Sequence, residues 1–298
     1  MISLPIIYGL LAAFLIGTSD FLSRFSAAKR SSVYPVMWVA FMGSLILWAY
    51  TSYFQDYNFA AQEAHIYFAT ALSGVLNVVA LICLYRAIAR GPVAVASPFV
   101  SSSTVFIVVI WFFMGVQPTI YNYLGMLLSV VGAITIGYFN KQKDTGHDTI
   151  HICQTAALSL IAAICFAVRL FLLQYFTEDI GADNALLQVR FFGLVAILIY
   201  ALYLTFKGNI IFPTQQDFKF RQDVLIPAAQ GVFETLGVLL ILIASVGDYR
   251  VTVPAVFASF SIVTVTWSVL IFKEKISIGR MIGIMILISG VVIIEISS

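Results

Sequence analysis

The segment IYFATALSGVLNVVALICLYRAIA (residues 66–89) decides the fold of this chain, because Arg86 is its only charged residue. A helix needs about 20 mostly apolar residues to cross the hydrocarbon core of a bilayer. The segment is long enough for one crossing. Lipid offers no partner to an open backbone, so a segment of this kind must be helical.

Nine further segments of similar length and hydropathy occur along the chain, so the sequence predicts ten membrane-spanning helices. The ten expected spans are Leu4–Ala28, Tyr34–Phe54, Ile66–Ala89, Val93–Met114, Ile120–Tyr138, Ile150–Phe176, Asn184–Phe206, Val224–Val246, Val251–Phe272 and Ser277–Ile296. The connections between them are too short for a soluble domain. The functional surface is therefore expected inside the bundle or at its mouths.

The composition agrees with an all-α integral membrane protein. Of the 298 residues, 61% are hydrophobic and 10% are charged. Soluble proteins carry about 25% charged residues, and a soluble globule could not cover its surface with so few. The formal net charge of +2 gives no reason to expect nucleic acid as a partner. The three cysteines have neither the spacing of a disulfide framework nor that of a metal site.

The two halves of the chain resemble each other in the spacing of glycine and proline. The matching positions are Gly91 and Pro98 with Gly247 and Pro254, and Gly125 and Gly132 with Gly283 and Gly290. We therefore expect a first five-helix repeat in residues 1–140, a linker at 141–149 and a second repeat in 150–298. Because five is odd, the repeats must be inverted. Inverted repeats around a central cavity are a device of secondary transporters.

The basic residues gather on one face if the ten spans alternate in direction. That face holds 13 of the 16 Lys and Arg residues: Arg24, Lys29, Arg30, Arg86, Arg90, Lys141, Lys143, Lys207, Lys219, Arg221, Lys273, Lys275 and Arg280. The positive-inside rule makes this face cytoplasmic. Both chain ends are then expected outside, in a prokaryotic cytoplasmic membrane.

Several short motifs carry a resemblance over nearly the whole chain. They are Tyr85–Pro92 (YRAIARGP), Phe272–Lys275 (FKEK), the Gly283 to Gly290 spacing and the Arg190-Phe191 pair. The chain resembles the ten-helix drug/metabolite transporter superfamily, specifically its EamA-type branch. The resemblance implies export or exchange of small metabolites, often amino acids, and no cofactor. It also implies a central cavity between spans 1, 3, 4, 6, 8 and 9, and chain ends that are more often cytoplasmic than the charge count predicts here.

Ionisable residues inside the spans are the first candidates for a functional site. Each costs roughly 2.5–3.5 kcal/mol on insertion scales and therefore usually faces the bundle interior. Glu234, in the middle of the eighth span, either holds a proton, binds a cationic group of the substrate or is neutralised by Arg169. Asn77 is its counterpart in the third span. Asp20 is a gate or coupling carboxylate, or forms an ion pair with Arg24 one helical turn away.

Two arginines are candidates for binding an acidic group of the substrate. A guanidinium presents a planar fork that matches a carboxylate or phosphate. Arg169 in the sixth span is expected to hold the carboxylate of an amino or organic acid, unless it pairs with Glu178 or Asp179. Arg190 in the seventh span is a further candidate at similar depth.

Small hydroxyl residues and prolines complete the predicted site. The hydroxyl candidates for lining the cavity are Ser101, Ser102, Ser103 and Thr104, with Ser259 in the matching group of the second half. Pro98 and Pro254 lie at equivalent points of the two halves, and each removes one helical hydrogen bond. Bending there would suit alternating access.

These features favour a secondary transporter or exchanger of small polar or amphipathic metabolites, with amino acids or related compounds as substrates. The chain has no Walker A sequence, so ATP is not expected to drive it. Proton coupling through Glu234 or Asp20 and simple facilitated exchange both fit. A passive channel and, less well, a membrane-embedded enzyme are the alternatives. The sequence leaves open whether the protein is a monomer or a homodimer.

Overall fold

A computed structural model describes residues 4–27, 32–54, 62–90, 96, 99–100, 102–117, 119–139, 149–209, 211–212, 218–247, 249–257, 259–272 and 278–296. Every regular element in these ranges is helical. The first half contains α1 (Leu4–Ala27), α2 (Val33–Phe54), α3 (Ala64–Arg90), α5 (Ser103–Phe113) and α6 (Ile120–Tyr138). The second half contains α7 (Thr149–Ile180), α8 (Ala182–Phe206), the π-helical turn η2 (Arg221–Leu225), α9 (Ile226–Ala244), α10 (Tyr249–Phe257), α11 (Phe260–Phe272) and α12 (Ile278–Ile296).

Six of the described helical segments are long and apolar enough to cross a membrane. They are α1, α2, α3, α7, α8 and the continuous segment formed by η2 and α9. The protein is therefore a multi-pass membrane protein. The other four expected spans contain α5, α6, the pair α10 and α11, and α12. The total of ten spans stays a prediction.

Two of the expected spans are interrupted rather than continuous. In the ninth, α10 ends at Phe257 and α11 begins at Phe260, with a turn in which the Ser259 amide donates to the Val256 carbonyl at 3.1 Å. In the fourth, a turn at Ser102 precedes α5, and the Ser102 amide donates to the Phe99 carbonyl at 3.3 Å. The two turns lie at equivalent points of the two chain halves. Pro254 lies inside α10, so the described interruption follows it rather than coinciding with it.

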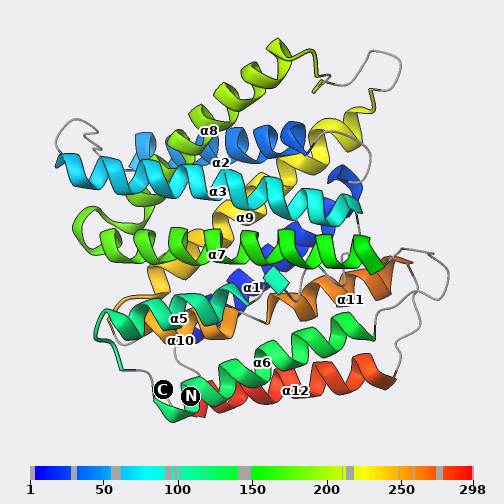
Figure 1. Cartoon of the computed structure of the whole chain (residues 1–298). Coiled ribbons are helices and arrows are strands. Elements are labelled where there is room, and N and C mark those ends of the chain that lie inside the picture. The colour runs from blue at the N-terminus through cyan, green and yellow to red at the C-terminus, as the bar shows by residue number, and fades with distance from the viewer. Residues whose placement is uncertain are drawn as a thin grey trace.

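The helices of the two halves are interleaved, and their contacts follow a repeated pattern. In Figure 1 the helices lie side by side in layers, and the labels of both chain ends lie at the same end of the bundle. Helix α1 packs on α9 and α11, while α7 packs on α3 and α5. Further strong contacts pair α6 with α12, α8 with both α2 and α3, and α2 with α9. Most of the packing therefore joins a helix of one half to a helix of the other.

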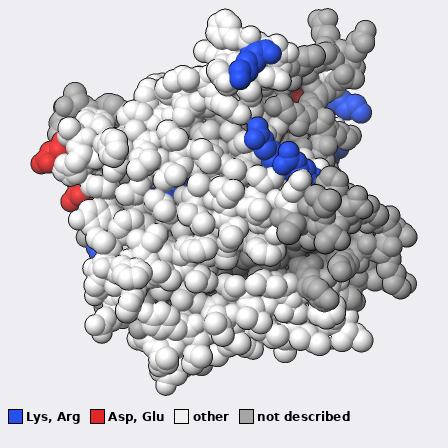
Figure 2. All heavy atoms as spheres, viewed as in Figure 1, with Lys and Arg blue, Asp and Glu red and all other residues white. Residues whose placement is uncertain are grey.

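The surface has the polarity expected of a protein that faces lipid. Most atoms visible in Figure 2 belong to uncharged residues, with the larger acidic patches at the left end and the larger basic patches toward the upper right. Large apolar side chains such as Trp48, Phe113 and Leu127 are exposed on the outside of the bundle. The charged residues that the sequence places within spans are therefore expected in the interior of the bundle.

Candidate functional site

A cavity lies in the middle of the bundle, between helices of both halves. It is lined by Ile16, Ser19, Asp20, Leu81, Leu84, Tyr85, Val100, Ser103, Thr104, Ile107, Phe166, Ala167, Arg169, Leu170, Glu234, Val238, Ile241, Phe257 and Phe260. The cavity has a volume of about 80 Å³, several times the roughly 10–15 Å³ that one water molecule needs on the same measure. It therefore has room for several water molecules or for part of a small solute.

The charged wall of the cavity brings together three of the residues expected from the sequence. Asp20 comes from α1, Arg169 from α7 and Glu234 from α9. The rest of the cavity wall is apolar and is formed by aliphatic residues and by Phe166, Phe257 and Phe260. The rings of Phe257 and Phe260 are stacked, with their centroids 5.0 Å apart. The cavity thus offers charges and apolar surface to the same solute.

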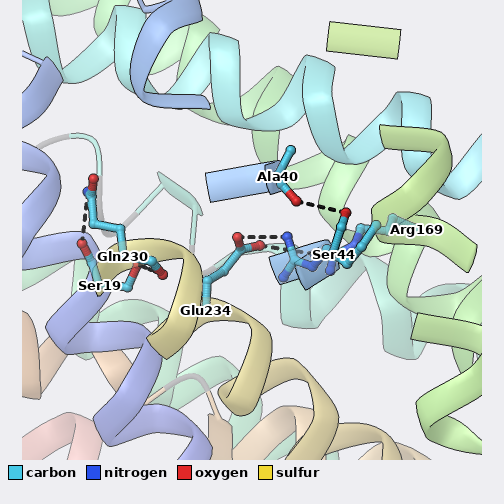
Figure 3. Close-up of polar contacts among 7 residues, drawn as sticks. Ser19, Ala40, Ser44, Arg169, Gln230 and Glu234 are labelled. Carbon is cyan, nitrogen blue, oxygen red and sulfur yellow. Dashed lines mark hydrogen bonds and ion pairs between the residues drawn. The ribbon is translucent and has the colours of Figure 1, made fainter. Parts of the chain in front are cut away.

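Glu234 is held by two arginines. Nη1 of Arg190 donates a hydrogen bond to Oε2 of Glu234 at 2.9 Å, and Nη1 of Arg169 lies 3.7 Å from Oε1. Figure 3 shows the Glu234 carboxylate directed toward the guanidinium groups. Only 9% of the Glu234 side chain is exposed, and the two arginines are exposed by 5% and 1%. Of the three carboxylates predicted as possible partners of Arg169, namely Glu234, Glu178 and Asp179, Glu234 is the one it contacts here.

Helix α2 packs closely against the Arg190 side chain at Gly43. A Cβ atom on Gly43 would lie 3.1 Å from Cδ of Arg190 and 2.5 Å from Oγ1 of Thr235, so only glycine leaves room for both side chains. Arg190 is not part of the cavity lining. It supports Glu234 instead of facing a solute.

The position of Asp20 is set by a polar connection between α1 and α9. Oγ of Ser19 donates to the carbonyl of Gln230 at 3.2 Å, and Nε2 of Gln230 donates to the carbonyl of Ser19 at 3.3 Å (Figure 3). Oγ of Ser26 donates to Oε1 of Gln230 at 3.0 Å. These bonds join the two helices that carry Asp20 and Glu234: Ser19 is adjacent to Asp20, and Gln230 is about one helical turn from Glu234.

The structure brings only part of the predicted hydroxyl set to the cavity. Thr104 lines it, whereas Ser102 and Ser259 do not, and Oγ of Ser102 instead donates to the Phe99 carbonyl at 2.6 Å. Asn77 is buried outside the lining, and its Oδ1 has no hydrogen-bond partner among the described residues. Ser101 and Pro98 lie outside the described residues, and Arg24 and Pro254 lie outside the lining.

Ser103, a further member of the predicted hydroxyl group, also lines the cavity, whereas two polar lining residues were not predicted: Ser19 and Tyr85. Ser19 is the direct neighbour of the predicted Asp20. Tyr85 belongs to a motif that carried only the family resemblance. Adjacent residues on a helix point about 100° apart. Which of two neighbouring polar residues faces the cavity therefore depends on how the helix is rotated, and the residue type alone does not tell.

An aromatic and polar layer lies one helical turn from the cavity. Nε1 of Trp111 donates to Oε1 of Gln174 at 2.9 Å, and the Arg250 guanidinium lies 5.0 Å from the centre of the Trp111 ring. Trp111 follows the lining residue Ile107 by one turn of α5, and Gln174 follows Leu170 by one turn of α7. The layer closes the bundle beside the cavity.

The same arrangement occurs at the equivalent positions of the other half. Nε1 of Trp267 donates to Oγ1 of Thr18 at 2.9 Å. Trp267 follows Trp111 by 156 residues, and Gln174 follows Thr18 by 156 residues. Each bond joins one half to the other. The equal offset of 156 residues relates the two bonds through the repeat, and it could be found only by aligning the two halves of the sequence.

We expect a Trp111→Phe protein to lose about 1–3 kcal/mol of folding free energy, since Oε1 of the buried Gln174 loses its donor. Equilibrium unfolding in mixed micelles measures the change. The matched control is Trp48→Phe, because Trp48 is 61% exposed on the outer surface. That variant is expected to stay within about 0.5 kcal/mol of wild type. Equal losses in the two variants would contradict a structural role for the Trp111 bond.

A bundle of apolar helices around a cavity lined by charged residues is the architecture of a membrane protein with a polar interior. The model of the EamA-like transporter family matches residues 3–138 and 154–296. The chain belongs to this family and is a membrane transporter. The two matches also divide the chain into two family repeats.

Solved structures confirm the fold. A structure described as "Crystal structure of protein" superposes with a TM-score of 0.74 at 13% sequence identity, covering 98% of this chain and 96% of that chain. No curated protein matches the chain.

Proposed function

We propose that this protein is a secondary transporter that moves small amphipathic metabolites by alternating access, with amino acids and related compounds as its substrates. One observation carries the proposal: a single cavity presents charged and apolar walls and is built by helices of both chain halves. Transport proteins with inverted repeats bind their substrates between the repeats near the middle of the bilayer.

The two kinds of wall suggest how a substrate is oriented. A guanidinium matches a carboxylate, so Arg169 binds the acidic group. Asp20 offers the negative charge for an ammonium group. The apolar body of the substrate contacts Phe257 and Phe260, since burial of apolar surface is favourable.

Alternating access is supported by the repeated contacts between the halves. Helix α1 meets α9 as α7 meets α3. The bonds of Trp111 and Trp267 occupy equivalent positions, and the turns at Ser102 and Ser259 lie within one residue of equivalent positions. These pairs fit two inverted five-helix repeats, ten spans in all, that rock against each other around the cavity.

The orientation in the membrane follows from charge. The basic face predicted from the sequence is opposite the end where both chain ends lie in Figure 1. The positive-inside rule then makes the basic loops cytoplasmic and both chain ends external. Cysteines introduced near each end, reacted with a membrane-impermeant maleimide on intact cells, test this orientation, and labelling only after lysis would reverse it.

Transport is tested with the purified protein in liposomes. Uptake of radiolabelled amino acids and organic acids is expected to saturate with concentration and to show counterflow when unlabelled compound is present inside. Linear flux without counterflow would indicate a channel. No protein-dependent flux for any compound in the panel would reject the transport function.

Proton coupling rests on the two carboxylates that line the cavity, Asp20 and Glu234. For Asp20→Asn we expect the ratio of uptake with an imposed pH gradient to uptake without one to fall to about one, because this variant has no exchangeable proton at that position. The wild-type ratio, measured with the same substrate and liposomes, is the reference. A gradient ratio equal to that of wild type would remove Asp20 from the coupling mechanism.

A further inference from the structure

Both arginines at Glu234 leave one edge of the guanidinium free among the described residues. Glu234 contacts Nη1 of Arg169 and of Arg190, whereas Nε and Nη2 of both are buried and have no hydrogen-bond partner in that part of the chain. Nε carries one hydrogen and Nη2 carries two. Together they form an edge of the planar fork that matches the two oxygens of a carboxylate.

The two arginines are unequal. The 2.9 Å contact of Arg190 is a hydrogen bond, while the 3.7 Å contact of Arg169 is too long for one. Arg169 lines the cavity and Arg190 does not. The arginine beside the cavity is therefore the one that holds Glu234 less tightly.

The charges at this point do not balance within the contact itself. Two guanidinium ions meet one carboxylate, and a buried charge without a counter-ion is strongly unfavourable. Glu234 supplies the only carboxylate within 4 Å of either guanidinium among the described residues. Asp20, the other carboxylate of the cavity wall in the described part of the chain, makes no ion pair with either guanidinium, so a second anion in contact with Arg169 would balance the charge at this point.

We propose that Glu234 is a resident anion that competes with the substrate's carboxylate for Arg169. The carboxylate of an incoming solute binds the unpaired Nε and Nη2 edge of Arg169 when the guanidinium turns this buried edge toward the cavity. Two carboxylates on one guanidinium repel each other, so Glu234 gives up its long contact with Arg169 and stays on Arg190. The inference rests on the proposed transport function and gives its substrate class as carboxylates with an apolar body.

The test compares two probes of nearly equal shape, 3-phenylpropionate and its neutral amide, 3-phenylpropanamide. Their dissociation constants are measured by titration calorimetry on the purified full-length protein. Wild type is expected to prefer the carboxylate over the amide. Glu234→Gln removes the competing anion and is expected to bind 3-phenylpropionate at least about tenfold more tightly than wild type does, with the affinity for the amide unchanged.

Two further variants keep the test decisive. Glu234→Asp keeps the charge but shortens its reach by one methylene, so its affinity for 3-phenylpropionate is expected to lie between wild type and Glu234→Gln. It decides the question if Glu234→Gln does not fold. Arg169→Met is expected to lose the preference for the carboxylate while it still binds the amide, which shows that the cavity is intact.

The inference is overturned if the carboxylate affinity stays equal or falls in the folded Glu234 variants, or if wild type binds neither probe. Failure of the transport function looks different. A wild-type protein that shows the expected order of affinities and yet gives no flux in liposomes contradicts transport alone. Flux without the expected order contradicts the resident anion alone.

Discussion

An Arg190→Met protein is expected to lose about 3–5 kcal/mol of folding free energy, because removal of one partner leaves a buried charge without compensation. Arg190 is 1% exposed, and its Nη1 donates a hydrogen bond of 2.9 Å to the Glu234 carboxylate. The remaining contact of Glu234 with Arg169, at 3.7 Å, does not replace it. Equilibrium unfolding in mixed micelles, followed by tryptophan fluorescence, measures the loss.

A second substitution separates the ion pair from packing. Adding Glu234→Gln to Arg190→Met removes the stranded carboxylate, so the double variant is expected to recover part of the lost stability. The interaction energy follows from the double-mutant cycle. Arg86→Met is the control, since Arg86 is an exposed arginine on the neighbouring α3. It is expected to change stability by about 0.5 kcal/mol or less, and an equal loss in Arg86→Met and Arg190→Met would contradict the role of the pair.

Gly17→Ala is expected to reduce transport at least about tenfold and to lower the folding free energy by about 1–3 kcal/mol, the usual cost of overpacking. A Cβ atom on Gly17 would lie 2.5 Å from the carbonyl oxygen of Phe260 and 2.7 Å from Cβ of Val263. Neither atom is the end of a flexible side chain, so α1 and α11 must move apart. Ile16 and Phe260, next to this contact, both line the cavity.

Gly9 on the same helix gives a matched control. A Cβ atom there would lie 3.4 Å from Val256 and 3.6 Å from Val253, which are ordinary contacts. Gly9→Ala is therefore expected to keep transport and to gain up to about 1 kcal/mol from the higher helix propensity of alanine. Uptake into liposomes and unfolding in micelles are measured for both variants. If Gly17→Ala transports as well as Gly9→Ala does, the close approach of α1 and α11 is not required.

The helices could be predicted from the sequence because length and hydropathy determine where a chain can cross a bilayer. The expected segment Ile120–Tyr138 agrees with α6 at both ends, and α1, α2 and α3 differ from the expected limits by at most two residues. The interruptions before α5 and α11 were not predicted. Small hydroxyl residues stand at both turns, but such residues also occur inside continuous helices, so they do not specify a turn. Pro254 lies five residues before the turn at Ser259 and does not locate it.

The candidate site could be predicted in its residue types and only in part in its contacts. Glu234, Arg169 and Asp20 stood out because charges inside spans are costly and rare, and all three line the cavity. Arg190 was proposed as a substrate ligand, but its 2.9 Å bond to Glu234 depends on how α8 and α9 pack. Spacing along one helix says which residues share a face, and it cannot say which other helix that face meets.

The pairing of Arg190 with Glu234 has a consequence for how the chain is made. Arg190 lies in α8 and Glu234 in α9, the next span to be synthesised. Alone in lipid, either charge carries an insertion penalty of a few kcal/mol. The two spans are therefore expected to leave the translocon together as a hairpin, with the partner on α9 arriving before α8 is released.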